Sequence, residues 1–168
     1  MAGIWVMLAA PAPDLIVTGN GRHAGIATGH GMALLRHRAG DYMRTTLSEL
    51  SGTDAEPLAL ADQPAAHCGR DMCVTVLEKG GRRWRIAATR SGYPVPWTSL
   101  VALCGRVDIM IADRRLPDAC QPRWLKLDSA VLKRTGGVSI RLDPPMVRMV
   151  RQPGDRHPWS MTGQRGGR

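Results

Sequence analysis

Four cysteines carry the most specific chemistry in this sequence. Cys68 and Cys73 stand with four residues between them and follow His67, whereas Cys104 and Cys120 have fifteen residues between them. Such residues form one of three kinds of site: a zinc centre, a redox-active dithiol or a disulfide. A redox-active dithiol usually has the C-x-x-C spacing, which the sequence does not contain.

The spacing favours two disulfides over a zinc centre. A four-thiolate zinc centre usually draws on two close pairs, and only Cys68 and Cys73 form one. All four cysteines lie in or beside predicted helices and strands, so they fit the bridges Cys68–Cys73 and Cys104–Cys120. In the chain-entropy model these bridges stabilise the fold by about 2 and about 3 kcal/mol. Disulfides persist in an oxidising compartment, and the alternative is four buried thiols in a reducing one.

The histidines do not form a metal-binding motif. None of the five has a partner at the spacing of H-x-H, H-E-x-x-H or H-x-x-x-H; they are His23, His30, His37, His67 and His157. A hydrolytic metal centre needs several imidazoles and carboxylates at one point, and no local pattern brings them together. We therefore predict no metal ligand, no catalytic residue and no cofactor.

The stretch "TGNGRHA" loosely matches a dinucleotide-binding fingerprint through Gly19, Gly21 and Ala24. That fingerprint works because its last position opens a helix whose N-terminus binds pyrophosphate. Here another apolar run broken by glycine follows, so the stretch is better explained as a hairpin turn.

The charge of the chain favours a polyanionic partner. Twenty-three Lys and Arg against fourteen Asp and Glu give a formal net charge of +9, and most of the cations are arginines. Arginine suits planar, bidentate contact with phosphate. A genome-wide bias toward Arg, Ala and Gly would explain the same composition without any such partner.

In the N-terminal half, short apolar runs separated by glycine predict strands over residues 14–18, 23–28 and 32–37. A helix should follow, with Asp41 as its N-cap and Gly52 at its end, and residues 53–67 should form a loop. "CVTVLEKGGRRWRIAATR" predicts a hairpin that turns at Gly80 and Gly81.

In that hairpin, alternation places Trp84 and Ile86 on one face and Arg83 and Arg85 on the other. We expect the first two to share one core with Val107, Ile109 and Ile111 of "VDIMIAD". That continuous apolar run predicts a buried central strand with a parallel neighbour.

The remaining elements alternate between helix and strand. A helix should begin at Thr98 or Ser99 and end at Gly105, and "RWLKLD" should form a strand. Asp128 should cap a helix that Gly136 ends, and two strands should flank the Pro-Pro turn of "GVSIRLDPPMVRMV". This order predicts an α/β fold with a sandwich-like plan.

The chain divides into three parts. Residues 13–151 form the single α/β domain, and residues 152–168 form a flexible basic tail. Residues 1–12 begin with an apolar run of about eight residues, well short of the ~20 needed to span a bilayer. They are either a frayed first strand or the remnant of a membrane helix with its linker.

Several segments resemble one known family. "PDLIVTGNGRHAGI", "HCGRDMCVTVLEKGGRRWRIAATRSGYPVPWTSLVALCGRVDIMIADRRLPDACQPRWLKLD" and "LKRTGGVSIRL" look like the C-terminal soluble region of ComEC-family competence proteins. These proteins are inner-membrane DNA-uptake channels. The resemblance covers residues 11 to about 159, and it implies a DNA partner, a membrane channel partner and a place on the periplasmic face of the inner membrane.

In that family the region follows the last membrane helix, which would account for residues 1–12. Larger members carry a metallo-β-lactamase-like domain there, so the resemblance implies an αββα sandwich with mixed sheets, in degenerate form. "VDIMIADRRLP" is similar in place to a strand that ends in a metal-associated His-His-Gly-Ser in active members. This chain has Asp113, Arg114, Arg115 and Leu116 instead, and it lacks the His-x-His-x-Asp-His signature.

The function that follows is a non-catalytic module that helps DNA import through sequence-independent phosphate contacts. The cations expected to make these contacts are Arg83, Arg85, Arg114, Arg115, Arg123 and Lys126. One alternative is a metal-dependent hydrolase or nuclease with ligands scattered in sequence, such as His23, His30, Asp113 and His157. Another is a structural plug domain that contacts only its channel. A periplasmic location would keep the cysteines oxidised.

Overall fold

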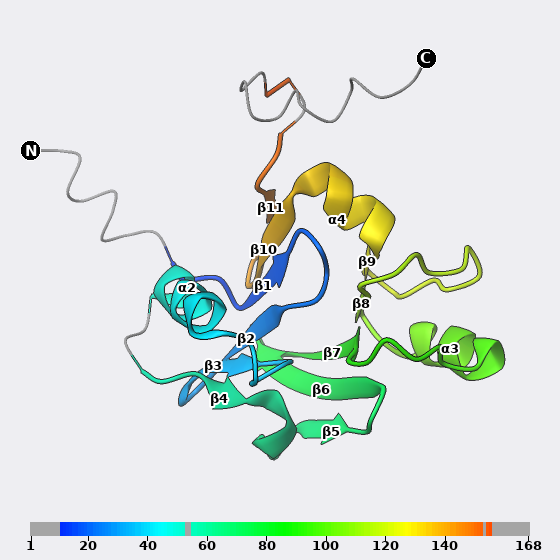
Figure 1. The fold of residues 1–168 in the computed structure, drawn as a ribbon, viewed down its shortest axis with the longest axis horizontal. Coiled ribbons are helices and arrows are strands. Elements are labelled where there is room, and N and C mark those ends of the chain that lie inside the picture. The colour runs from blue at the N-terminus through cyan, green and yellow to red at the C-terminus, as the bar shows by residue number, and fades with distance from the viewer. Residues whose placement is uncertain (1–10, 53–54, 153, 156–168) are drawn as a thin grey trace, which may run out of the picture.

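Two β-sheets face each other in the computed structural model, which describes residues 11–52, 55–152 and 154–155 (Figure 1). Sheet A has the strand order β11-β10-β1-β2-β3-β4, and sheet B has the order β5-β6-β7-β8-β9. The strands of sheet A are β1 Leu15–Thr18, β2 Ala24–Thr28, β3 Gly31–Leu34, β4 Leu58–Ala59, β10 Gly137–Leu142 and β11 Pro145–Met149. Those of sheet B are β5 Ala66–Cys68, β6 Met72–Lys79, β7 Arg82–Thr89, β8 Ile109–Ile111 and β9 Leu125–Leu127.

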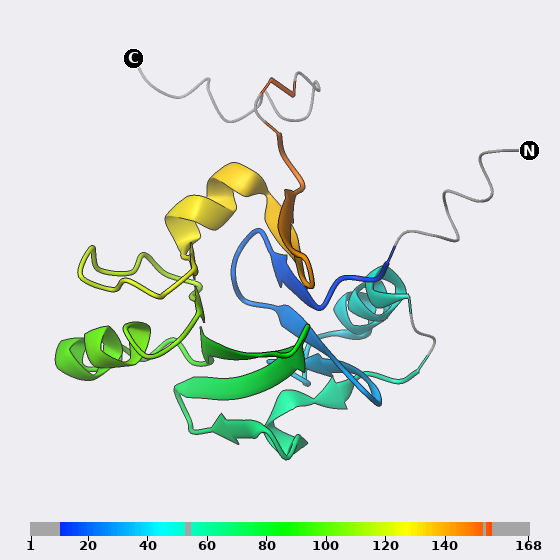
Figure 2. The same ribbon diagram turned by 180° about the vertical axis from the view of Figure 1, so that it is seen from behind.

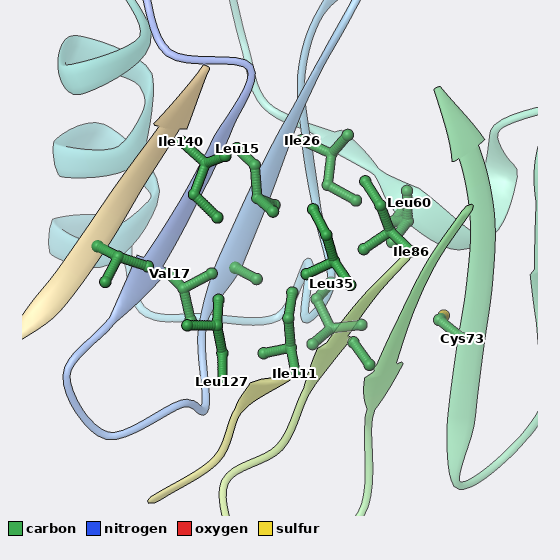
Figure 3. Packing of buried hydrophobic residues seen from close by; sticks show 14 of the residues in the cluster. Leu15, Val17, Ile26, Leu35, Leu60, Cys73, Ile86, Ile111, Leu127 and Ile140 are labelled. Carbon is green, nitrogen blue, oxygen red and sulfur yellow. The ribbon is translucent and has the colours of Figure 1, made fainter. Parts of the chain in front are cut away.

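The main core fills the space between the two sheets. Figure 3 shows side chains of sheet A, such as Leu15 and Ile140, directed toward Ile86, Ile111 and Leu127 of sheet B. Alternating residues of both sheets supply this layer, because successive side chains of a strand point to opposite faces. With no Phe in the chain, aliphatic side chains and the buried ring of Trp84 do the packing.

Helices cover the outer faces of the sheets. The helix α2 (Asp41–Ser51) packs Leu47 against Ile16, Met32 and Leu34 of sheet A. The helix α3 (Trp97–Cys104) covers the part of sheet B that carries residues such as Ala87 and Met110, and a third helix, α4 (Ser129–Thr135), connects sheet B to sheet A. Figures 1 and 2 show α2 and α3 on opposite sides of the sheet pair. The α/β class is therefore confirmed.

Local sequence signals account for the elements that were predicted correctly. Gly80 and Gly81 both have positive φ, at 58° and 69°, which is the backbone of the two-residue turn that joins β6 to β7. The strand β8 is buried and has parallel neighbours on both sides, β7 and β9. Asp128 caps α4 by accepting hydrogen bonds from the backbone N–H groups of Ala130 and Val131, and Gly136 ends that helix in the left-handed conformation.

Four predictions need correction. The N-cap of α2 is Gly40, and Asp41 is the first helical residue, where its charge still suits the positive end of the helix. The third strand ends at Leu34, short of residue 37. Residues 53–67 are not all loop, since they contain β4, a 3-10 turn over Leu60–Asp62 and the start of β5. Val107 lies beneath α3 and not between the sheets.

Parts of the expected chain organisation lie outside the described residues. This is the case for residues 1–10 of the expected membrane-helix remnant and for most of the expected basic tail. Within the described part of the chain, every helix is too short or too polar to cross a lipid bilayer.

The two disulfides join the pairs that the sequence favoured. Cys68 and Cys73 are directly opposite each other on β5 and β6, so their bridge ties an edge strand to its neighbour. Cys104, at the end of α3, is bonded to Cys120 in the segment between β8 and β9, and both cysteines are buried. The second bridge therefore fixes α3 and that segment against the outer face of sheet B.

Removing the Trp84 ring should destabilise the protein strongly, because the side chain is only 2% exposed and fills the space between the sheets. Trp84→Ala should lower the free energy of unfolding by about 3 to 5 kcal/mol in urea denaturation. The control is Arg83→Ala on the exposed face of the same strand, with an effect within about 0.5 kcal/mol. A loss below about 1 kcal/mol for Trp84→Ala would contradict the strand phase.

Protein produced in an oxidising compartment should contain no free thiol before reduction. Peptide mapping should then recover Cys68 linked to Cys73 and Cys104 linked to Cys120. Replacing each pair by serine should lower the free energy of unfolding by about 2 and about 3 kcal/mol, since the second bridge closes the longer loop. Four alkylatable thiols in the exported protein would contradict the assignment.

Candidate nucleic-acid interface

An open cleft of about 560 Å³ lies where the parallel strands of sheet B end. The strands β7, β8 and β9 run in the same direction, and each is followed by a residue of the cleft wall: Gly92 after β7, Asp113 and Arg114 after β8, and Ser129 after β9. The turn between β1 and β2 and the helix α4 supply the other lining residues, which are Gly19, Asn20, Arg22 and Lys133. The carboxyl ends of parallel strands are the usual place for a ligand in open α/β sheets.

Asp113 is held by three groups at the edge of this cleft. Arg36, which follows β3, donates from Nη2 to one carboxylate oxygen at 3.1 Å. The hydroxyl of Thr89 and the Nε of Arg114 donate to the other oxygen at 3.3 and 3.2 Å. Two guanidinium groups thus neutralise the one carboxylate of the cleft, so Asp113 is poorly suited to hold a cation.

The described residues do not support the metal-binding alternative. They contain no group of three or more His, Cys, Asp or Glu side chains arranged to hold a metal ion. His23, His30 and Asp113 are therefore not brought together as ligands, and His157 lies outside the described residues.

Arg114 holds the loop after β7 against the end of β8. Its Nη1 donates to the carbonyl oxygens of Gly92 and Tyr93 at 3.5 and 2.8 Å, and its Nη2 donates to that of Ser91. Together with the bond to Asp113, these contacts occupy most of its N–H groups. Arg114 therefore positions the cleft wall in addition to adding charge to it.

The turn between β1 and β2 fits tightly against the cleft floor, and its glycines explain the apparent dinucleotide fingerprint. A Cβ on Gly21, whose φ is 68°, would lie 2.6 Å from the carbonyl oxygen of Ala112 after β8. A Cβ on Gly19 would lie 2.9 Å from the backbone of Gly136 after α4. The prediction of a hairpin turn is confirmed, because β1 and β2 are antiparallel neighbours. The close packing places Asn20 and Arg22 on the cleft wall.

The pKa of His23 is lowered by its partly buried position and by two nearby arginines. Burial, followed by the charges of Arg36 and Arg22, lowers the pKa of the His23 imidazole below its usual value of 6.5. All three effects act in the same direction, since each disfavours the imidazolium. The side chain is therefore neutral at pH 7.

A second group of cations lies on the outer face of sheet B, on the half that α3 leaves uncovered. Arg83, Arg85 and Arg123 line a hollow of about 280 Å³ together with Val76 and Asp108. We refer to these three arginines as the outer basic patch. The register pairs Val76 with Arg85 across β6 and β7, and the opposite face of β7 carries the buried Trp84. The alternation of β7 thus separates the patch from the core, as predicted.

The acidic residues near the outer basic patch are already engaged. Asp108 is buried, accepts a bond from the backbone N–H of Arg85 at 2.8 Å, and pairs with Arg82 Nη2 at 3.0 Å. Glu78 contacts Arg83 at 3.4 Å, but both side chains are largely exposed, so water screens the attraction. A phosphate can replace Glu78 at little cost.

The structure does not gather the six predicted cations on one rim. Arg83, Arg85 and Arg123 share the outer basic patch, whereas Arg114 lines the cleft. Arg115 is exposed, and the ammonium group of Lys126 donates to the carbonyl oxygen of Pro117 at 2.7 Å.

Sequence reasoning did not single out Arg22, Lys133 or the exposed Tyr93 as functional. Arg22 and Lys133 reach the cleft from a turn and a helix that are far apart in sequence. The only local signal was the position of Arg22 in a glycine-rich turn. Comparison with known proteins found no family model, no curated protein and no solved structure that matches the chain.

The His23 imidazole should titrate with a pKa below 6.5 in the folded protein. Arg22→Gln should raise that pKa, yet leave it below 6.5, because burial is the larger cause and Arg36 remains. Since the unfolded chain binds this proton more readily, His23 should reduce stability as the pH falls through 6.5 toward the folded pKa. Two-dimensional NMR of the imidazole resonances measures both values, with Arg83→Gln as a control that leaves them unchanged. A pKa at or above 6.5 would contradict the buried, cationic surroundings.

Proposed function

We propose that this chain is the non-catalytic C-terminal module of a ComEC-like DNA-uptake channel, and that it binds incoming DNA through phosphate contacts alone. The observation that carries the proposal is the outer basic patch, where three arginines converge on one hollow of an uncovered sheet face. The single carboxylate that lines this hollow, Asp108, is already paired with Arg82. Apart from the exposed and solvent-screened pair of Arg83 with Glu78, the patch thus presents its positive charge to solvent.

The shape of the patch supports contact with phosphate and not with bases. Its arginines project from the strand β7 and from the segment before β9, on one face of sheet B. These arginines lie on a strand and a connecting segment and not on a helix that could enter the major groove, where direct contacts to bases read the sequence. Binding should therefore be indifferent to sequence.

The engagement of Asp113 supports a module without nuclease activity. At the place where active relatives would carry metal ligands, this chain places a carboxylate between two guanidinium groups. The resulting field opposes a divalent cation.

The two disulfides support a location on the periplasmic face of the inner membrane. Bridges such as Cys68–Cys73 and Cys104–Cys120 persist where thiols are oxidised. The resemblance to the competence family implies the same side, so the cysteine chemistry and the resemblance point to one location.

One observation favours the alternative of a structural plug domain that contacts only its channel. The outer face of sheet A carries a largely apolar hollow of about 530 Å³ between α2 and β11. Tyr42, Leu50, Met149 and Val150 are exposed around it, and Pro13, near the start of the described chain, lines it as well. In the family the membrane helices precede this point, so an apolar segment of the channel is the partner that would cover this face.

DNA binding by the outer basic patch should depend steeply on salt. Each neutralised duplex phosphate contributes about 0.9 to the slope of log affinity against log salt, so three arginines predict a slope of about −3. The double variant Arg85→Ala/Arg123→Ala should reduce the slope to about −1 and weaken all sequences alike. Fluorescence anisotropy of labelled duplexes of different sequence, across a salt series, measures both effects.

A matched control separates the patch from net charge. Arg38→Ala/Arg44→Ala removes two cations outside the patch and should change the slope by less than about 0.5. No binding at low salt would contradict the proposal and favour the structural plug. Cleavage of the duplex on adding a divalent metal, in protein free of contaminating nuclease, would favour the hydrolase.

A further inference from the structure

The cleft at the end of the parallel strands lies where such folds often bind ligands, and its charge is that of an anion site. We propose that it binds a phosphate monoester, specifically the phosphate of a nucleoside monophosphate or of a nucleic-acid strand end. This site goes beyond the proposed duplex binding, because the outer basic patch shares no lining residue with it. The ligand class follows from the charge, size and surroundings of the cleft.

Positive charge in and next to the cleft exceeds negative charge. Four cations, Arg22, Arg36, Arg114 and Lys133, lie on its wall or against Asp113, which is its only carboxylate. The excess is therefore three positive charges. Arg22 and Lys133 are exposed, and neither has a carboxylate partner among the described residues.

Two further observations concern the positive charge beside the cleft. The Nε of Arg36 is buried without a hydrogen-bond partner in the described part of the chain. Burial first, and then the charges of Arg36 and Arg22, lower the pKa of the neighbouring His23 imidazole. The contributions of Arg36 and Arg22 to this shift are in line with a positive potential beside the cleft, which an anion would relieve.

The positions of the cations in the cleft suit a phosphate monoester, which is close to a dianion, better than a phosphodiester, which carries one negative charge. Arg22 comes from the turn of sheet A, and Lys133 comes from α4, so the two free cations belong to different elements of the wall. A phosphate monoester carries about −1.5 to −2 charge at pH 7 and has three acceptor oxygens. The Ser129 hydroxyl and the Asn20 amide provide neutral donors on the same wall, and Gly92, with open space at its Cβ position, leaves the backbone open to close approach.

The cleft has room for more than phosphate. Its volume of about 560 Å³ falls in the range of sites for small organic ligands. Tyr93 follows the lining residue Gly92, and its backbone carbonyl accepts a bond from Arg114, so its backbone lies beside the cleft. Its side chain is 59% exposed, and Arg70 stacks on the ring at 4.6 Å from the centroid. An exposed aromatic ring beside cations is a platform on which a nucleobase can stack.

The test uses 5′-AMP, inorganic phosphate and adenosine as probes of the full-length protein. Isothermal titration calorimetry at low salt and pH 7.5 should show binding of 5′-AMP, weaker binding of phosphate and none of adenosine. Arg22→Ala/Lys133→Ala should weaken 5′-AMP at least tenfold, since each charge-assisted hydrogen bond contributes well over a factor of ten. Tyr93→Ala should weaken 5′-AMP but leave phosphate unchanged.

A strand end is distinguished from a free nucleotide by competition. A short single strand with a 5′-phosphate should displace 5′-AMP from the wild-type protein more effectively than the same strand without it. Displacement by neither strand would restrict the site to free nucleotides, and equal displacement by both would show that the terminal phosphate is not recognised; either result contradicts the strand-end part of the proposal.

The control variant keeps this proposal separate from duplex binding. Arg85→Ala/Arg123→Ala should retain full affinity for 5′-AMP, because neither arginine lines the cleft. If 5′-AMP binds and duplex DNA does not, only the proposed function fails. If 5′-AMP does not bind, or binds equally to Arg22→Ala/Lys133→Ala, the cleft proposal is wrong. Both substituted cations are exposed, so circular dichroism should show an unchanged fold.

Discussion

The carboxylate of Asp113 joins the two sheets at the edge where the parallel strands end. It binds Arg36 after β3 of sheet A, Thr89 at the end of β7 and Arg114 after β8. Arg114 in turn holds the loop that follows β7 through three backbone carbonyl groups. Removing this one charge would leave two guanidinium groups close together without their shared partner, which is the costly way to break a partly buried ion pair. The position of the cleft wall therefore depends on Asp113.

Other aspartates are also buried and bonded within the fold, and this leaves fewer carboxylates to balance the cations on the surface. Asp14, Asp108 and Asp128 are all buried, and each accepts at least one backbone N–H bond. For Asp128, burial alone would raise the pKa, but bonds from three backbone N–H groups and the charge of Lys126 lower it below 3.8. Asp14 and Asp108 each also pair with one half-exposed cation, Lys79 and Arg82, and these carboxylates leave the remaining surface cations without a partner from the interior. The excess of positive charge thus reaches solvent with little compensation.

Predictions from sequence succeeded where a single local signal decides the structure. The Gly80–Gly81 turn, the apolar run of β8 and the Asp128 cap each depend on a few neighbouring residues. The predictions failed where long-range pairing decides the structure. The strand β4 exists because it pairs in parallel with β3. Val107 packs beneath α3 through a register that no local pattern specifies. The candidate site shows the same limit. Strand alternation predicts that Arg83 and Arg85 of the outer basic patch are exposed. The cleft, in contrast, combines a turn and a helix that are more than a hundred residues apart in sequence.

Under the proposed relationship to the competence proteins, this fold would bind an anion at the place where active members bind a metal cation, with the same arrangement of strands and helices. The edge of a parallel sheet gathers loop residues whatever their chemistry, because the strand ends meet there. When those residues are imidazoles and carboxylates, they hold a metal; when they are arginines around one carboxylate, the metal is repelled and an anion is favoured. Asp113 and Arg114 stand at two adjacent positions of this edge, and the glycines at 19 and 21 keep the opposite wall in place. Glycine packing thus holds one wall of the cleft, whereas the charged contacts of Asp113 and Arg114 hold the other.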